Sequence, residues 1–400
     1  MNTPLSAAPW RLRLKAEFRP MAACGMLGAA GYAAYSVLAV LLRILSRDAG
    51  IAEANIGILA SADLTGILIG SLCLSRVTRP GNSRVIGAAS IVLGLLTNLL
   101  TPWLHGLLIL ILIRFLAGFA GGACIALAIA GLARFGNVFF NTAIFSGFAI
   151  AGASLELVLI SCVEQVGGGA FGSYLVIVLF FLAAGSILKW YPEMRAPEEA
   201  EGNAPVKLHD TRKSKAPLFI LISVLLYGMG MSAFFAYVGL LGSKQGISDG
   251  TMTQIFAVAN ILSLAGSWLS FKVADRFGPV LPQIISLMLF AAMLVVFPTR
   301  DSPIIYSLFV MMSCQLAILV QNGQIGALLE HDASGRTAAL IPTAFGVGLA
   351  IGPLLGSFLL AEYDSYRAQL VMEAICMLSA GSILALLLLG RNSRTNPLPS

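Results

Sequence analysis

Charge is scarce in this sequence. Charged residues make up 11% of its 400 residues, whereas soluble globular proteins carry about a quarter. A soluble core with 58% hydrophobic residues would also need far more polar surface to cover it. The apolar runs are continuous rather than alternating, which argues against a β-barrel. The composition therefore indicates an all-α membrane protein.

Residues on which catalysis, metal binding and ATP hydrolysis depend are also few. The three histidines, His105, His209 and His331, are scattered and offer no nucleophile–base pair, which disfavours an enzyme. No G-x-x-x-x-G-K-[ST] loop occurs, so transport powered by ATP hydrolysis within this chain is disfavoured. The six cysteines lie inside apolar runs without metal-type spacing. We expect no enzymatic activity, no cofactor and no metal site.

The positive charge falls in short clusters between the apolar runs. The net charge is +6, and this clustering follows the positive-inside rule rather than the pattern of a nucleic-acid-binding surface. With both termini in the cytoplasm, most Lys and Arg residues lie in cytoplasmic segments. The outer segments then hold only Arg43, Arg47, Lys244, Arg300 and Arg367. We predict cytoplasmic N- and C-termini and no nucleic-acid partner.

Twelve apolar runs are long enough to cross a bilayer, which takes about 20 residues. A polar segment rich in charge and proline, 191–216, interrupts them and is interpreted as a cytoplasmic linker. It separates an N-terminal six-helix bundle, residues 1–190, from a C-terminal one, residues 217–400. The predicted spans are 20–44, 54–75, 84–104, 106–133, 140–163, 171–190, 217–241, 251–271, 279–298, 303–327, 337–361 and 366–390.

The two halves resemble each other in sequence. Three segments of the first half align without gaps on segments in corresponding spans of the second half. The aligned pairs are 60–81 with 257–278, 113–127 with 314–328, and 142–152 with 343–353. An even number of spans in each copy makes the repeats parallel, an arrangement that places a site between two bundles. We therefore expect two parallel-repeat six-helix bundles around a central cavity.

Two groups of motifs resemble those of the major facilitator superfamily. Asp275, Arg276 and Gly278 follow the eighth span like the family's cytoplasmic D-R-x-G loop. The corresponding loop of the first half keeps Arg79 and Gly81 but lacks the acid. The small residue that the family usually carries four positions before this acid is also replaced in both copies.

The other motifs lie inside spans. The fourth span contains an R-x-x-x-G motif, Arg114 to Gly118, and the eleventh contains Gly348, Gly352 and Pro353 in a G-x-x-x-G-P-x-x-G pattern. The family's antiporters carry the latter pattern in the fifth span, where this chain has no proline, so uptake and efflux both stay open. The resemblance implies a secondary transporter whose spans 1, 4, 7 and 10 line a cavity.

Three charged residues lie deep inside spans of the first half: Asp63, Arg114 and Glu156. Buried charges in spans are costly and mark function by default. From a rise of about 1.5 Å per residue, we expect these three to lie at similar depth. The repeat aligns them with neutral polar residues, namely Asn260, Gln315 and Ser357. Glu373, nearer the end of the last span, is interpreted as snorkelling or locally hydrogen-bonded.

One arginine neutralises one carboxylate, which leaves the second carboxylate without a counter-charge. A lone carboxylate in a low dielectric takes up a proton readily. We therefore predict that Asp63 and Glu156 couple transport to protons, with Arg114 as their counter-ion or as a clamp for an anionic substrate. Three alternatives stay open: a static structural triad, three residues without mutual contact, and an uncoupled or anion-exchanging carrier in which Arg114 holds an organic anion.

Polar and aromatic residues of the cavity-lining spans are the candidates for substrate binding. The substrate is expected to be a small organic molecule of unspecified identity, and the protein to be a monomer in a bacterial inner membrane. A channel or receptor is the weaker alternative, because the two-fold repeat together with the deep charges of the first half argues against it. The predicted substrate-binding residues are Tyr32, Tyr35, Arg114, Tyr227, Asn260, Gln315 and Asn322.

Overall fold

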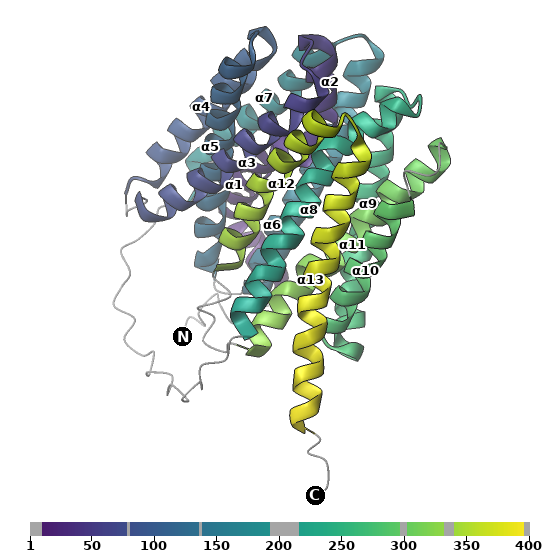
Figure 1. Cartoon of the computed structure of the whole chain (residues 1–400). Coiled ribbons are helices and arrows are strands. Elements are labelled where there is room, and N and C mark those ends of the chain that lie inside the picture. Colours follow the sequence, from purple (N-terminus) through teal and green to yellow (C-terminus); the bar gives the residue numbers. More distant parts are fainter. Residues whose placement is uncertain are drawn as a thin grey trace, which may run out of the picture. The chain divides into compact units, whose positions relative to one another are not determined.

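The structure is a computed structural model in which residues 10–77, 81–135, 138–192, 216–296, 302–331 and 340–395 are described (Figure 1). Within these ranges the chain forms helices and no strand, which confirms the predicted all-α fold. The helices group into two compact units. The first unit comprises Met1–Ala49 and Ala62–Lys207, and the second comprises Gly50–Ser61 and Leu208–Ser400. The predicted linker lies almost entirely outside the described residues.

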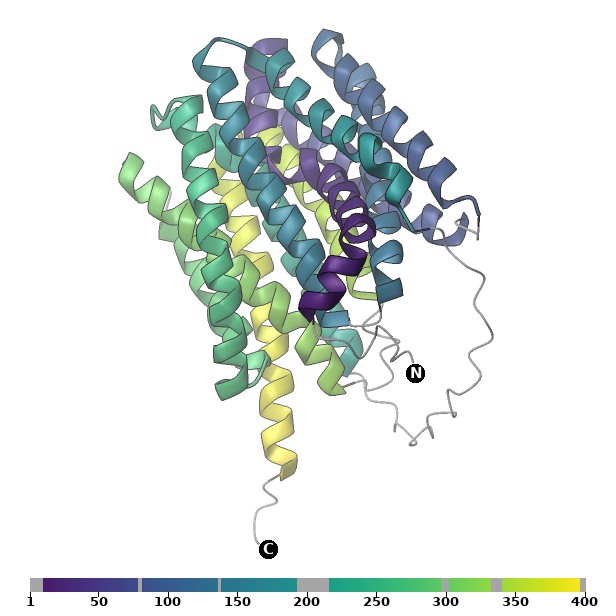
Figure 2. The same cartoon turned by 180° about the vertical axis from the view of Figure 1, so that it is seen from behind.

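The first unit is built on seven helices, one of which it shares with the second unit. The helices are α1 (Trp10–Ser36), α2 (Leu38–Ala49), α3 (Glu53–Val77, from Ala62 onward), α4 (Ser83–Leu100), α5 (Leu107–Leu132), α6 (Val138–Gln165) and α7 (Gly169–Ile187). Helix α1 packs against α5, α6 and α7, and α4 packs against α5 and α7. Figure 2 shows α6 alongside α1.

The first predicted span, 20–44, is two helices rather than one. Helices α1 and α2 meet at an angle of 51° around Val37. The hydroxyl of Ser36 lies 2.9 Å from the carbonyl oxygen of Ala33, and such back-bonding to the preceding turn bends helices. No proline or glycine marks this break, so the sequence pattern alone did not indicate it.

The second unit repeats the pairings of the first. Its helices are α8 (Ala216–Lys244), α9 (Asp249–Phe277), α10 (Val280–Val296), α11 (Pro303–His331), α12 (Ile341–Tyr363) and α13 (Tyr366–Thr395), with the first residues of α3 added. Helix α8 packs against α11, α12 and α13 as α1 packs against α5, α6 and α7. Helix α10 packs against α11 and α13 as α4 packs against α5 and α7. These matching contacts agree with the predicted internal repeat.

The helices have the length and surface of membrane spans. Among the described residues, nine helices are long and apolar enough to cross a bilayer, and the bent α1–α2 pair makes a tenth. Large apolar side chains such as Val85, Leu108 and Ile304 are exposed, at 70%, 70% and 72%. Exposed apolar side chains on apolar helices are suited to lipid rather than water. The protein is an integral membrane protein.

Two aligned glycines both have a positive φ. Gly81, before α4, has a φ of 88°, and Gly278, which ends α9, has a φ of 74° and a ψ of 167°. Residues with side chains are strained there. The repeat alignment had paired these two glycines, so a shared backbone requirement explains their identity.

We expect Gly278→Ala to destabilise the protein by about 1–3 kcal/mol, because alanine is strained at this φ and ψ. The matched control is Gly250→Ala in the first turn of α9, where an added Cβ meets nothing within 4 Å. That control should keep the wild-type thermal unfolding midpoint of the detergent-purified protein. Equal midpoints for the two variants would contradict the strain argument.

Candidate functional site

A buried ion pair joins α3 and α5 in the first unit. Asp63 is 2% exposed and Arg114 is 3% exposed. The Arg114 Nη2 donates to Asp63 Oδ2 at 2.5 Å, and its Nη1 donates to Asn98 Oδ1 on α4 at 3.0 Å. The guanidinium carbon also lies 5.4 Å from the centre of the Tyr174 ring on α7. Side chains from four helices of the unit, α3, α4, α5 and α7, therefore surround this ion pair.

Glycines bring the two helices of this pair into backbone contact. A Cβ added to Gly118 on α5 would overlap the backbone carbonyl of Asp63, and one added to Gly122 would overlap that of Ile67. From the other side, a Cβ on Gly66 of α3 would overlap the carbonyl of Phe115. Small residues at both surfaces allow this approach. It sets the separation at which Asp63 and Arg114 meet.

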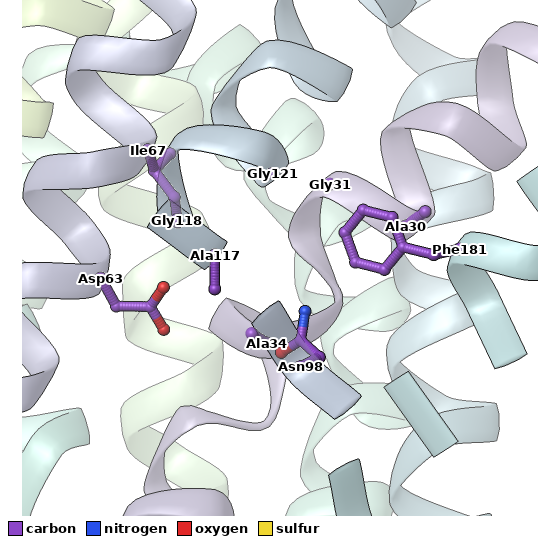
Figure 3. A pocket seen from close by; sticks show the side chains of 10 residues that line it. All are labelled: Ala30, Gly31, Ala34, Asp63, Ile67, Asn98, Ala117, Gly118, Gly121 and Phe181. Atoms are coloured by element: carbon purple, nitrogen blue, oxygen red, sulfur yellow. The ribbon is translucent and has the colours of Figure 1, made fainter. Parts of the chain in front are cut away.

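A small pocket lies beside the ion pair. Its wall is formed by α1, α3, α4, α5 and α7, and Figure 3 shows the Asp63 carboxylate and the Asn98 amide at its edge. The second carboxylate oxygen of Asp63, Oδ1, is buried and accepts no hydrogen bond among the described residues. Protonation of this oxygen, or a hydrogen bond donated by a water molecule, would satisfy it. The residues that line the pocket are Ala30, Gly31, Ala34, Asp63, Ile67, Asn98, Ala117, Gly118, Gly121 and Phe181.

Glu156 on α6 has a different environment. It is 1% exposed, and its Oε2 lies 2.8 Å from the Ser36 hydroxyl at the end of α1. Its Oε1 is buried and without a hydrogen-bond partner in the described part of the chain. The structure thus brings Asp63 and Arg114 together and gives Glu156 a separate partner.

The Ser36 hydroxyl has two acceptors but only one proton. It lies 2.9 Å from the Ala33 carbonyl, which can only accept, and 2.8 Å from Glu156 Oε2. With Glu156 ionised, Ser36 can donate to both acceptors only by sharing its single proton between them. With Glu156 protonated, its carboxyl can donate to Ser36, and the hydroxyl proton is left for the Ala33 carbonyl. The geometry is therefore satisfied by a neutral Glu156.

The repeat counterparts of the ion pair lie at the α9–α11 contact of the second unit. The Gln315 side chain on α11 reaches α9, where it lies 3.3 Å from the Ala259 carbonyl. With its amide turned over, it donates to Leu262 O at 3.0 Å and accepts from Ser263 N at 3.1 Å. Asn322 Nδ2, two turns further along α11, donates to Ser270 Oγ at 2.7 Å. Asn260 lies half-buried on α9.

Comparison with known proteins identifies the family. A sequence model of the Major Facilitator Superfamily matches residues 23–328. The chain belongs to the Major Facilitator Superfamily. It is similar to a chloramphenicol resistance protein of Streptomyces lividans, with 25% identity over 342 residues, covering 80% of this chain and 84% of the relative. Members of the superfamily are transporters, so the chain is a membrane transport protein and not an enzyme.

Solved structures of the superfamily share the fold. A D-xylose-proton symporter aligns with a TM-score of 0.71 and 13% identity, covering 92% of this chain and 97% of the symporter. The nucleoside transporter NupG aligns with a TM-score of 0.71 and 12% identity, covering 94% of this chain and 99% of NupG. At such low identity, these likenesses support the fold and leave the substrate of this chain open.

The predicted substrate-binding aromatics of this superfamily member fall into two environments. Tyr32 and Tyr35 on α1 are half-buried. Tyr32 lies 5.9 Å from the ring centre of Tyr35 and 5.7 Å from that of Phe145 on α6. Tyr227 on α8 is fully buried, and its hydroxyl donates to the Ala317 carbonyl at 3.2 Å. Its hydroxyl is thus engaged within the second unit.

The superfamily-like motifs of the second unit have distinct surroundings. A Cβ on Gly348 or Gly352 of α12 would overlap backbone carbonyls of α8, and Pro353 lies inside α12 beside them. Asp275 and Arg276 are exposed at the end of α9, where the Arg276 guanidinium carbon lies 5.3 Å from the centre of the Phe277 ring. Arg79 lies outside the described residues. The α12 glycines therefore form a close helix contact.

Asn98 and Tyr174 are site residues that sequence reasoning missed. Both are neutral, so a search for charged residues in apolar runs passes over them. Asn98 did carry a signal, because it is a polar residue with two-sided hydrogen-bonding capacity inside the third predicted span. Tyr174 carried none, since aromatics are common near the ends of spans.

Proposed function

We propose that the protein is a proton-coupled secondary transporter that moves a small organic molecule by alternating access. The supporting observation is the contrast between two buried carboxyl groups of one unit. Asp63 is paired with a cation, whereas Glu156 is held by a hydroxyl that has a single proton for two neighbours. Two such groups can exchange protons at different stages of a transport cycle.

In this proposal Glu156 carries the proton in the conformation described here. A carboxylate buried without a cation is costly, so the neutral form is favoured. Asp63 stays ionised as long as Arg114 is close. A proton arriving at Asp63 Oδ1 from the adjacent pocket would neutralise Asp63 and leave Arg114 with Asn98 and Tyr174 alone. Protonation thereby weakens the α3–α5 contact.

Helix α1 connects the two carboxyl groups. Ala34 lines the pocket beside Asp63, and Ser36, two residues later, contacts Glu156. A shift of α1 caused by proton loss at Glu156 would therefore alter the pocket wall at Asp63. The break between α1 and α2 lies directly at this contact, which gives α1 a point about which to move.

The anion-clamp alternative receives less support. In this conformation Arg114 is already engaged by Asp63, Asn98 and Tyr174. An anionic substrate would have to displace Asp63 and leave a second buried carboxylate without a partner. Such an exchange is expensive unless Asp63 is protonated in the same step.

We infer a location in a bacterial inner membrane with both termini cytoplasmic, on the strength of the basic clusters described above. The substrate is best sought by thermal-shift screening of the detergent-purified protein at two pH values. Chloramphenicol, xylose and nucleosides form the first panel, because the similar proteins are named for these compounds. Organic acids and amines form the second panel and also test the anion-clamp alternative.

We expect Asp63→Asn and Glu156→Gln to abolish accumulation driven by a pH gradient, because each removes an exchangeable proton. Substrate counterflow in proteoliposomes without a gradient should persist, since it needs no net proton movement. The exposed Glu362→Gln serves as the matched carboxyl-to-amide control and should keep both activities. If both variants still accumulate the screened substrate under a pH gradient, the proposed coupling is excluded.

A further inference from the structure

A third buried carboxyl group, Glu373, lies in the second unit. It sits on α13 and is fully buried, as is Gln369 one turn earlier. The Gln369 amide nitrogen donates to Glu373 Oε1 at 2.8 Å and to the Ala233 carbonyl of α8 at 3.4 Å. The local hydrogen bond expected from the sequence is therefore present, whereas snorkelling is excluded by the complete burial.

The Gln369 amide beside this carboxyl group has no hydrogen left to donate. An amide NH₂ has two protons, and both are used by Glu373 Oε1 and Ala233. Glu373 Oε2 and Gln369 Oε1 are buried and have no donor among the described residues. An ionised Glu373 would hold a buried negative charge on an oxygen without any hydrogen bond, which is strongly unfavourable.

No cation lies close enough to replace these donors in the described part of the unit. The titratable neighbours are Tyr237 on α8, which is close enough to interact electrostatically with Glu373, and Cys376 on α13 itself. Helix α10, packed against α13, has no ionisable residue. On α12, Glu362 and Tyr363 are exposed at its far end. Lys244, at the end of α8, is paired with Glu53 at 3.2 Å.

The packing around Glu373 also leaves little room for a hydrated ion. A Cβ on Gly230 of α8 would overlap the side chain of Met377 and come within 3.3 Å of the Glu373 carbonyl oxygen. A Cβ on Gly356 of α12 would overlap the Tyr237 ring and lie 3.6 Å from Gln369 Cγ. Helices α8 and α12 thus pack tightly against α13 around Gln369 and the backbone of Glu373. Such packing favours a proton over a hydrated ion as the ligand of the carboxyl group.

We propose that Glu373 is a proton-binding site of the second unit and is protonated in the conformation described here. Loss of this proton would place a negative charge among α8, α12 and α13. It would act on Tyr237, whose hydroxyl lies 2.9 Å from Ser357 Oγ and accepts from the Gly57 N–H at 3.1 Å. The site would therefore link proton release to the packing of α8 in this unit. This inference does not depend on the roles proposed for Asp63 and Glu156.

Infrared difference spectroscopy during a pH titration tests the proposal, because protonated carboxyl groups have a carbonyl stretch that carboxylates lack. The protein to use is the Asp63→Asn, Glu156→Gln variant, in which the other two acids that are at most 2% exposed among the described residues are already amides. We expect a protonated-carboxyl band at neutral pH that shifts on ¹³C-glutamate labelling. The band should disappear when Glu373→Gln is added and persist when Glu362→Gln is added instead.

Absence of the band in the Asp63→Asn, Glu156→Gln variant at neutral pH would overturn the proposal, as would a band that sodium ions abolish. If Glu373→Gln does not fold, the variant Gln369→Leu is used instead to assign the band to Glu373. It removes the hydrogen bond to Glu373 Oε1 and should shift the band without abolishing it. A band that is unchanged in Gln369→Leu belongs to another glutamate and also overturns the proposal.

Discussion

Replacing Arg114 by glutamine is expected to destabilise the protein by about 3–5 kcal/mol, the cost of leaving one member of a buried ion pair alone. Asp63 would then be a buried carboxylate without a cation. Adding Asp63→Asn should recover most of this loss, because it removes the stranded charge. The chain already uses this neutral combination, since its repeat has Asn260 and Gln315 at the aligned positions.

Denaturant or thermal unfolding of the purified protein measures these changes in stability. The single variant Asp63→Asn completes a double-mutant cycle with Arg114→Gln and the double variant. That variant leaves Arg114 buried with Asn98 and Tyr174, and should be destabilised as well. The double variant should fold but fail to accumulate substrate under a pH gradient. Two results would show that the ion pair is not what stabilises Asp63. One is a loss of less than about 1 kcal/mol of unfolding free energy in Arg114→Gln. The other is a double variant that is no more stable than Arg114→Gln alone.

The helical fold and the ion pair were predictable because both leave patterns that can be recognised in the amino-acid sequence. Apolar runs mark spans, and the charged residues Asp63 and Arg114 are conspicuous inside them. Depth along the helices allowed these two residues to meet, and the structure shows that they do. The repeat alignment also pairs Gly81 with Gly278, and the structure gives both a positive φ.

The partner of Glu156 could not be predicted in the same way. Rise per residue fixes how deep a side chain lies but not which way it points around the helix axis. Glu156 faces Ser36 on α1, and Arg114 faces Asp63 on α3. The same limit applies to Gln315 and Asn322, whose side chains bond to α9. It applies equally to the break at Val37, which depends on a hydroxyl and its surroundings rather than on a helix-breaking residue.

The three buried carboxyl groups differ in how their charge is accommodated. Asp63 has a cation, Glu156 has a shared hydroxyl, and Glu373 has an amide whose protons are all in use. Protonation is therefore favoured least at Asp63 in this conformation. Asp63 is accordingly the group whose protonation should change most when Arg114 moves, and the Arg114 variants probe that step directly.

Gly118→Val is expected to disrupt the site without touching a charged residue. Its Cβ would overlap the backbone carbonyl of Asp63, and backbone cannot rotate away as a side chain can. Helices α3 and α5 would have to separate, at a cost of about 1–3 kcal/mol or more. The separation would also pull Asp63 from Arg114, so accumulation under a pH gradient should be lost together with stability.

Gly147→Val on α6 is the matched control for this prediction. Gly147 is a helical glycine of the same unit, it is exposed, and an added Cβ meets nothing within 4 Å. Both variants undergo the same change in helix propensity, from glycine to a β-branched residue, so the difference between their unfolding midpoints isolates the α3–α5 contact. Equal stability and equal accumulation in the two variants would mean that this contact can widen freely. The glycines would then not be what holds Asp63 and Arg114 together.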